Sequence, residues 1–113
     1  MANAFKLKNH SGASVNADTF TSVYTVPSAT TTIVLGLTLA NLTASDIAIT
    51  VTMTDTSASI VSNVTKLAVV PGKSSLEIMS GNKYVMEATD ILKVKSDTAN
   101  SLDTTLGIME ITA

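Results

Sequence analysis

The chain has no cysteine, no tryptophan and no arginine, and its seven basic residues are all lysines. The absence of cysteine excludes disulfides, thiol catalysis and cysteine-ligated zinc. Scattered lysines at a net charge of −2, without arginine to contact phosphates and bases, argue against nucleic-acid binding. No apolar run approaches the ~18 residues of a membrane span, and residues 1–8 lack the apolar core of a signal peptide. We therefore expect no nucleic acid and no membrane among its partners.

Charge is also scarce, at 14% of residues against about 25% in ordinary globular domains. The 18 threonines and 13 serines must therefore cover much of the surface. Threonine is β-branched and suits a half-exposed pleated surface, so the composition favours strands over helices. A surface with so few charges is weakly protected against association. Much of it is expected to contact other protein.

A period of two runs through the middle of the chain. From residue 47 to 54 the apolar side chains are Ile47, Ile49, Val51 and Met53. Residues 33–40 similarly place Ile33, Leu35, Leu37 and Leu39 on one face. Such alternation is typical of half-buried β-strands. The polar residues 41–46 between the two runs predict a hairpin turn that pairs them.

Short strands with turn signals every 8–12 residues predict one antiparallel β-sandwich, Ig-like or jelly-roll-like, of about eight strands. Residues 71–74 predict a turn in which Pro71 takes the second position and Gly72 supplies positive φ at the third. Residues 1–19 are expected to form an irregular N-terminal arm, with a short strand near Phe5 and Leu7 as the alternative, and residues 20–113 the sandwich. The strands are expected at residues 21–26, 30–40, 47–54, 60–61 with 65–70, 75–79, 84–86, 91–96 and 104–112.

The predicted core consists of aliphatic residues on one face of these strands: Val26, Ile33, Leu35, Leu37, Leu39, Ile47, Ile49, Val51, Leu67, Leu76, Ile78, Leu92, Val94, Leu106 and Ile108. The opposite positions Thr38, Thr50, Thr52 and Thr54 predict an uncharged, hydroxyl-lined outer face. Gly36 and Gly107 lie inside strands, where glycine permits a bulge or a close backbone approach.

Residues for catalysis are few, and we assign no catalytic, cofactor-binding or metal-ligating residue and no cofactor. His10 is the one histidine and lies in the expected arm, so a Ser-His-Asp triad or a histidine-based zinc site is not supported. Glu77, Glu87 and Glu110 could supply the paired carboxylates of a glycosidase, but acids on strands usually face solvent. Lys93 and Lys95 share a strand face and are interpreted as a solvated edge. Phe5, Phe20, Tyr24 and Tyr84 give no aromatic platform for a sugar.

Several motifs occur together in an order known from one group of proteins. They are Val23-Tyr-Thr-Val-Pro27, Thr30-Thr-Thr-Ile-Val34, Gly36-Leu-Thr-Leu-Ala-Asn41, Val70-Pro-Gly-Lys-Ser-Ser-Leu76, Gly81-Asn-Lys83, Val85-Met-Glu87 and Glu110-Ile-Thr112. Together they resemble small virion structural proteins of tailed bacteriophages, common in phages of cyanobacteria and marine bacteria. The resemblance covers residue 21 to the end. It implies a structural component of the virion, assembled in the host cytoplasm, with no catalytic motif to transfer.

Three hypotheses follow. The first is a virion protein that acts through protein–protein contacts, as a homo-oligomer bound to the major capsid protein or to neck or tail proteins. Within it we expect a trimeric decoration or cement protein of the head in preference to a neck, tail or fibre component. The second is a receptor- or carbohydrate-binding module. The third, a small hydrolase with paired carboxylates, is disfavoured, and we expect no enzymatic activity.

Overall fold

The computed structural model describes residues 2–13, 17–79 and 81–112. Nine strands and no helix lie within these residues. None of the described segments is therefore a helix of the length and apolarity that a membrane crossing requires. The strands are β1 (Ala2–Ala13), β2 (Thr21–Thr25), β3 (Thr30–Asn41), β4 (Ile47–Asp55), β5 (Ile60–Val70), β6 (Ser75–Glu77), β7 (Tyr84–Met86), β8 (Ile91–Ser96) and β9 (Leu102–Thr112).

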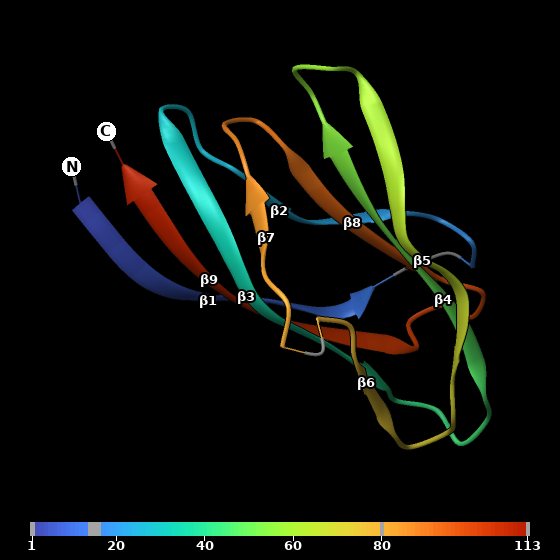
Figure 1. Cartoon of the computed structure of the whole chain (residues 1–113). Helices are drawn as coiled ribbons and strands as arrows, with labels where there is room; N and C mark the ends of the chain where they lie inside the picture. Colours follow the sequence, from blue (N-terminus) through green and yellow to red (C-terminus); the bar gives the residue numbers. More distant parts are fainter. Residues whose placement is uncertain (1, 14–16, 80, 113) are drawn as a thin grey trace.

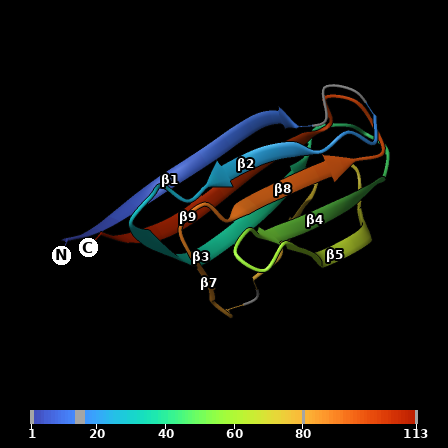
Figure 2. The same ribbon diagram turned by 90° about the horizontal axis from the view of Figure 1, so that it is seen from above.

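The strands form two antiparallel sheets packed face to face (Figures 1 and 2), which confirms the predicted β-sandwich. In the first sheet, called sheet A, the order is β1-β9-β3, and both β6 and β7 pair with the far side of β3. The second, sheet B, has the order β2-β8-β4-β5. One side of the sandwich is formed by β1 and β2, and the opposite side by β5, β6 and β7 (Figure 2).

The N-terminal segment differs from the expected irregular arm, because Ala2–Ala13 form a strand of sheet A. From Ala2 to His10, β1 pairs residue by residue with β9, and Ala2 is the partner of Thr112. Its alternation of Phe5 and Leu7 with lysines, weighed above as a short strand, thus marks a long one. Residues 14–16 lie outside the described residues, so the boundary expected at residue 19 stays a prediction.

A β-bulge in β3 corrects the predicted face of that strand. The pairing of β3 with β9 shifts between Val34 and Gly36, and the extra residue reverses which side chains point inward. Val34 before the bulge and Leu37 after it are therefore buried, whereas Ile33 is half-buried and Leu35 is 37% exposed. Ile33 and Leu35 were wrongly predicted as core.

The loop after β3 is not a hairpin turn, because β3 belongs to sheet A and β4 to sheet B. It crosses between the sheets, and Asn41 organises it from a buried position. Asn41 Nδ2 donates to the carbonyl oxygens of Ser45 at 2.8 Å and Val70 at 3.0 Å, while Oδ1 accepts from Thr43 N at 2.9 Å. The predicted pairing of residues 33–40 with 47–54 is therefore wrong.

The predicted threonine face is also corrected, because Thr50 and Thr52 are 3% and 4% exposed. Their partners on β8 are Lys95 and Lys93, and lysine stems commonly cover neighbouring surface. On the other side β5 bulges, and the N–H of Leu67 donates to Thr50 Oγ1 at 3.2 Å. Leu67 itself adopts φ 55 and is 56% exposed, so it is not the core residue that was predicted.

The core lies between the sheets and contains most of the predicted residues. Leu76 and Ile78 pack against it from half-buried positions. Members that the alternation did not identify include Tyr24, Val34, Val70, Met79, Met86 and Leu102.

The turn at residues 71–74 exists with different roles for its residues. Ser74 N donates to Pro71 O at 3.2 Å, so Pro71 is the first residue of the turn and Lys73, at φ 59, takes the left-handed third position. Gly72 is needed because a Cβ there would lie 2.2 Å from the carbonyl oxygen of Ala44. The glycine thus serves a close backbone approach and not a positive φ.

Candidate functional site

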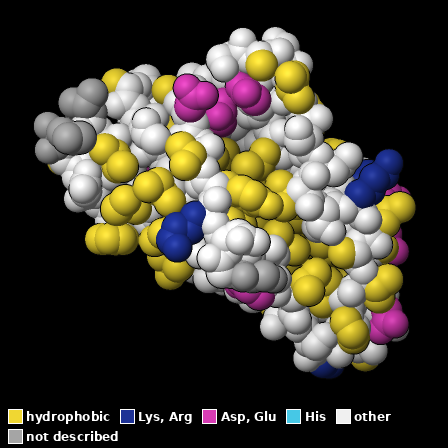
Figure 3. Space-filling model, in the orientation of Figure 1, with side chains coloured by type: hydrophobic (Ala, Val, Ile, Leu, Met, Phe, Trp, Pro, Cys, Tyr) yellow, Lys and Arg dark blue, Asp and Glu magenta, His cyan; other side chains and the backbone are white. Residues whose placement is uncertain are grey.

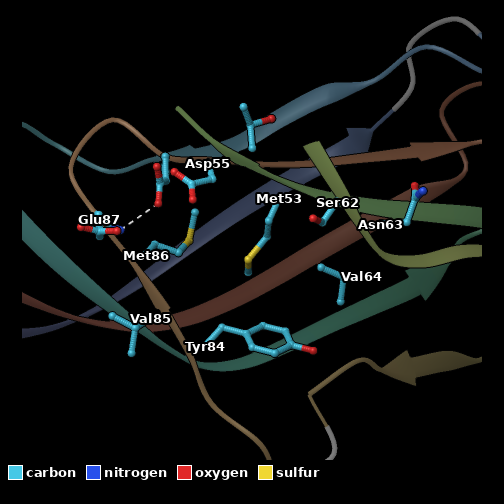
Figure 4. A pocket seen from close by; sticks show the side chains of 11 residues that line it. Met53, Asp55, Ser62, Asn63, Val64, Tyr84, Val85, Met86 and Glu87 are labelled. Carbon is cyan, nitrogen blue, oxygen red and sulfur yellow. Dashed lines mark hydrogen bonds between the residues drawn. The ribbon is translucent and has the colours of Figure 1, made fainter. Parts of the chain in front are cut away.

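A groove of ≈ 390 Å³ opens between the sheets where β5 faces β7. Its walls come from the end of β4, the middle of β5 and the whole of β7. The side chains of Met53, Val64, Tyr84 and Met86 point into this space (Figure 4). Figure 3 shows a hollow with a hydrophobic floor at this place and acidic side chains along its upper rim.

The acidic rim consists of Asp55, Glu87 and Asp90. Asp90 is 9% exposed and fully engaged: Oδ1 accepts from Thr56 N at 3.1 Å, and Oδ2 accepts from Glu87 N at 2.9 Å. Asp90 thereby ties the turn after β7 to the turn after β4. Hydrogen bonds from Ser57 and the N–H of Ala58 lower the pKa of Asp55, which stays charged.

The groove offers apolar contact and hydrogen-bond acceptors. Ser62 is part of the lining, but neither histidine nor lysine occurs among the described lining residues to activate it as a nucleophile. Nor do the described residues contain a group of three His, Cys, Asp or Glu side chains that could hold a metal ion. The arrangement is suited to binding a ligand or a segment of protein.

A second polar cluster is buried at the other side of the sandwich, between β1, β2, β3 and β9. The Tyr24 hydroxyl donates to Glu110 Oε2 and lies 2.8 Å from Thr32 Oγ1. Lys6 reaches in from the edge strand and places Nζ 2.6 Å from Glu110 Oε1. Glu110 is 5% exposed, so the expectation that it faces solvent is wrong.

The electrostatics of this cluster follow from its contacts. Hydrogen bonding with Lys6, together with the hydrogen bond from Tyr24, holds the pKa of Glu110 below its ordinary value. Burial raises the pKa of Tyr24 to about 12, and the bond to the Glu110 carboxylate adds to that rise. The cluster is therefore a charged carboxylate that a neutral phenol and a cation hold through charge-assisted hydrogen bonds, which are stronger than hydrogen bonds between neutral groups.

Glu77 and Glu110 lie in different hydrogen-bonding environments and far from each other. Glu77 is the partner of Thr38 on β3, and Glu110 that of Thr32, six residues away; at about 3.3 Å per residue their backbones are roughly 20 Å apart. Partial burial opposes ionisation of Glu77, but hydrogen bonds from Thr38 Oγ1 and the N–H groups of Leu37 and Met79 lower its pKa. The spacing of Glu77 and Glu110 exceeds that of known glycosidase pairs, ~5–9.5 Å.

The other candidate residues lie apart from the groove. His10 belongs to strand β1 and not to a loop; it is half-buried beside its partner Thr104. Among the described residues neither His10 Nδ1 nor Thr104 Oγ1 has a hydrogen-bond partner. Lys95 Nζ lies 5.0 Å from the centroid of the Phe20 ring, a cation–π contact on the outer face of sheet B.

The sequence contains a signal for the buried cluster that the prediction of a solvent-facing Glu110 did not use. Glu110 has the same parity as Leu106 and Ile108, so a continuous alternation along β9 places it inward. The groove had no such signal, because its walls come from strands distant in sequence.

Comparisons with known proteins identify the fold. No protein-family model matches the chain, and no curated protein does. A solved chain from Bacillus endospore appendages, described as a novel family of disulfide-linked pili, is similar with a TM-score of 0.56 at 12% identity. The similarity covers 98% of this chain and 87% of the pilus chain. At this identity the two proteins share a fold.

Proposed function

We propose that this protein is a structural subunit that acts through protein–protein contacts with copies of itself and with other proteins of a larger particle. The observation that carries the proposal is its exposed apolar surface. Phe5, Leu7, Val61 and Val85 are 75%, 64%, 63% and 66% exposed. Apolar area left in water is unfavourable, and large patches of it mark contact sites. The scarcity of charge, noted above, favours the same role.

Within this role we propose a decoration or cement protein on the head of a tailed phage, with a neck, tail or fibre component as the alternative. The resemblance of residues 21–112 to phage virion proteins supports this assignment. The fold shared with a pilus chain supports self-assembly in general. The disulfide linkage of those pili does not transfer, because this chain has no cysteine.

The test is the composition and architecture of the purified particle. Mass spectrometry should detect the chain in virions at a fixed ratio to the major capsid protein, and cryo-electron microscopy should place its density on the head. Density at the neck or tail would favour the alternative location. Absence from purified particles would refute the structural role.

A second candidate, a binding module for a receptor or carbohydrate, is favoured by the groove. Tyr84, 38% exposed, lines it together with Asp55 and Glu87 of the acidic rim, a combination of ring and acceptors that sugar hydroxyls can use. A glycan array should then show binding that Tyr84→Ala abolishes and Phe20→Ala, at a 42% exposed ring outside the groove, leaves intact. No binding by the parent protein would exclude this candidate.

A further inference from the structure

One half of the outer face of sheet A carries apolar side chains across its full width. Phe5 of β1 pairs with Met109 of β9, Met109 with Ile33 of β3, and Ile33 with Val85 of β7. These four residues form one continuous row that points away from the core, since their chain neighbours Val34, Met86, Ile108 and Glu110 are buried. Cross-strand neighbours on one face are in contact, so the row is one surface.

The adjoining rows extend this surface without adding charge. On one side lie Asn3, Ile111 and Thr31, which are partners across β1, β9 and β3. On the other side lie Leu7 with its partner Gly107, and Leu35 beside the bulge. The outward residues that β1, β9 and β3 contribute to these three rows, all within the described part of the chain, include no charged side chain. Lys83 and Glu87 lie at the β7 end of the adjoining rows, where Glu87 lines one hollow with Thr31 and Ile111. We call this surface the uncharged face.

Two glycines make the uncharged face uneven, because they carry no side chain. Gly36 and Gly107 are partners on β3 and β9, and a Cβ on either would meet nothing within 4 Å. They leave a shallow hollow between Leu7, 64% exposed, and Leu35, 37% exposed. Projecting leucines beside a hollow form a surface that a copy of itself can interlock with about a twofold axis.

The edge strand shows that this face, and not the edge, is built for contact. β1 turns Phe5 and Leu7 outward and Lys6 and Lys8 toward the inner side, where Lys6 pairs with Glu110. Inward-pointing charges on an edge strand hinder pairing with another edge. The arrangement therefore disfavours extension of sheet A through β1 and leaves the apolar side chains available for packing on the face.

We propose that the uncharged face is the surface through which two copies of this chain pack face to face. The exposures of its seven apolar side chains correspond to roughly 500 Å² of accessible surface, as large as the largest patch on a typical monomer. Two such faces with their rims of Asn3, Thr31 and Thr105, an exposed residue two positions before Gly107 on β9, approach the ~1,200 Å² at which stable interfaces begin. A second copy is the occupant because an uncharged surface creates no self-repulsion and offers no charge to a charged partner.

This inference deepens the proposed function. It rests on that function because a structural subunit must contact copies of itself. Hydrophobic side chains gather over β1, β9 and β3 at the end of the molecule that holds both termini (Figure 3). Val85 also lines the groove, so pairing through the uncharged face would reach that wall of the groove and would leave sheet B free for other contacts in a particle.

The test is sedimentation equilibrium of the purified full chain with two matched substitutions. Val85→Lys lies on the uncharged face, and Val69→Lys lies on β5 at 60% exposure, close to the 66% of Val85. The parent should form dimers, Val85→Lys should weaken the dimer at least tenfold, and Val69→Lys should leave it unchanged. Because both valines are exposed, neither change should alter the melting temperature by more than about two degrees.

A second variant distinguishes a lost interface from misfolding of the Val85→Lys protein. Leu7→Lys, at the opposite edge of the same face, should weaken the dimer as Val85→Lys does. A parent chain that is monomeric at every concentration, one that forms the trimer expected from the sequence, or a dimer that only Val69→Lys disrupts would overturn the inference. Each of these results would leave the structural role untouched if the chain is still found in particles, whereas absence from particles would refute that role and not the dimer.

Discussion

At the scale of single residues, the buried cluster around Glu110 makes the clearest prediction about pH. In a Tyr84→Phe variant, which leaves Tyr24 as the only tyrosine, the tyrosinate absorbance should titrate with a midpoint near 12 and not at the ordinary 10.0. A raised pKa in the folded state means that the phenol contributes stability below pH 10 which is lost as the pH rises toward 12. Alkaline unfolding should therefore begin within that window.

The control for this titration is Glu110→Gln. The neutral amide removes the charge that disfavours the tyrosinate, so the midpoint should move down toward 10.0. Glu110 itself affects stability at low pH and in the opposite direction. Folding lowers its pKa, so ionised Glu110 stabilises the folded state above the unfolded pKa. This stabilisation is lost as the pH falls through the folded pKa. An ordinary midpoint in the Tyr84→Phe protein would contradict a buried Tyr24 hydroxyl.

Two glycines allow a matched comparison between a position that lies against neighbouring backbone and one that faces open space. Gly72→Ala should cost about 1–3 kcal/mol of the free energy of unfolding, because its Cβ would meet the Ala44 carbonyl oxygen at 2.2 Å. Gly107→Ala should stay within about 0.5 kcal/mol of the parent, since its Cβ enters open space. Urea denaturation measures both, and equal costs would mean that the loop after β3 does not lie against Gly72.

At the scale of the elements, the bulge in β3 separates two leucines that the sequence pattern treats alike. Leu37→Ala should destabilise the fold by about 2–5 kcal/mol because Leu37 is fully buried. Leu35→Ala, two residues earlier and 37% exposed, should cost less than about 1 kcal/mol. Thermal melting distinguishes the two, and a Leu37→Ala variant that melts within a degree or two of the parent would contradict the packing described.

The loop between the sheets depends on the Asn41 side chain. Asn41→Asp replaces a donor with a buried carboxylate that faces the carbonyl oxygens of Ser45 and Val70, and should cost about 3 kcal/mol or more. Asn63→Asp makes the same change at an exposed position of β5 and should be nearly neutral. Denaturation curves for the pair test whether Asn41 is the hub of this crossing.

The elements also show how far the sequence could predict the fold. Alternation at Ile47, Ile49 and Val51 identified a strand and its buried face, because a period of two is local. Gly36 indicated a position in β3 where a bulge is possible, and the register shifts there. That the bulge reverses the buried face, and that β5 bulges at Leu67, could not be predicted, since each depends on the register with a neighbouring strand. The same holds for the site: no local pattern joins Met53, Val64 and Tyr84 into one groove.

At the scale of the whole molecule, the two ends of the chain lie together, with Ala2 opposite Thr112 in the β1–β9 pair (Figure 1). A circular permutant with a short linker between the native ends and new ends in the exposed turn at residues 57–59 should fold, because no core element is cut. Its melting temperature should stay within about ten degrees of the parent. Opening the chain at residues 43–44 is the control, and it should destabilise far more because it disrupts the contacts of Asn41 and Thr43.

The pairing of the first strand with the last also determines how the protein can bear mechanical load. A force that pulls the two ends apart acts on one end of an antiparallel ladder, so its hydrogen bonds break one after another and not all at once. Tension passed through the termini would peel β1 away at low force and expose the carboxylate of Glu110, which Lys6 holds. The fold therefore resists load best when the stress enters through its faces and not through its termini.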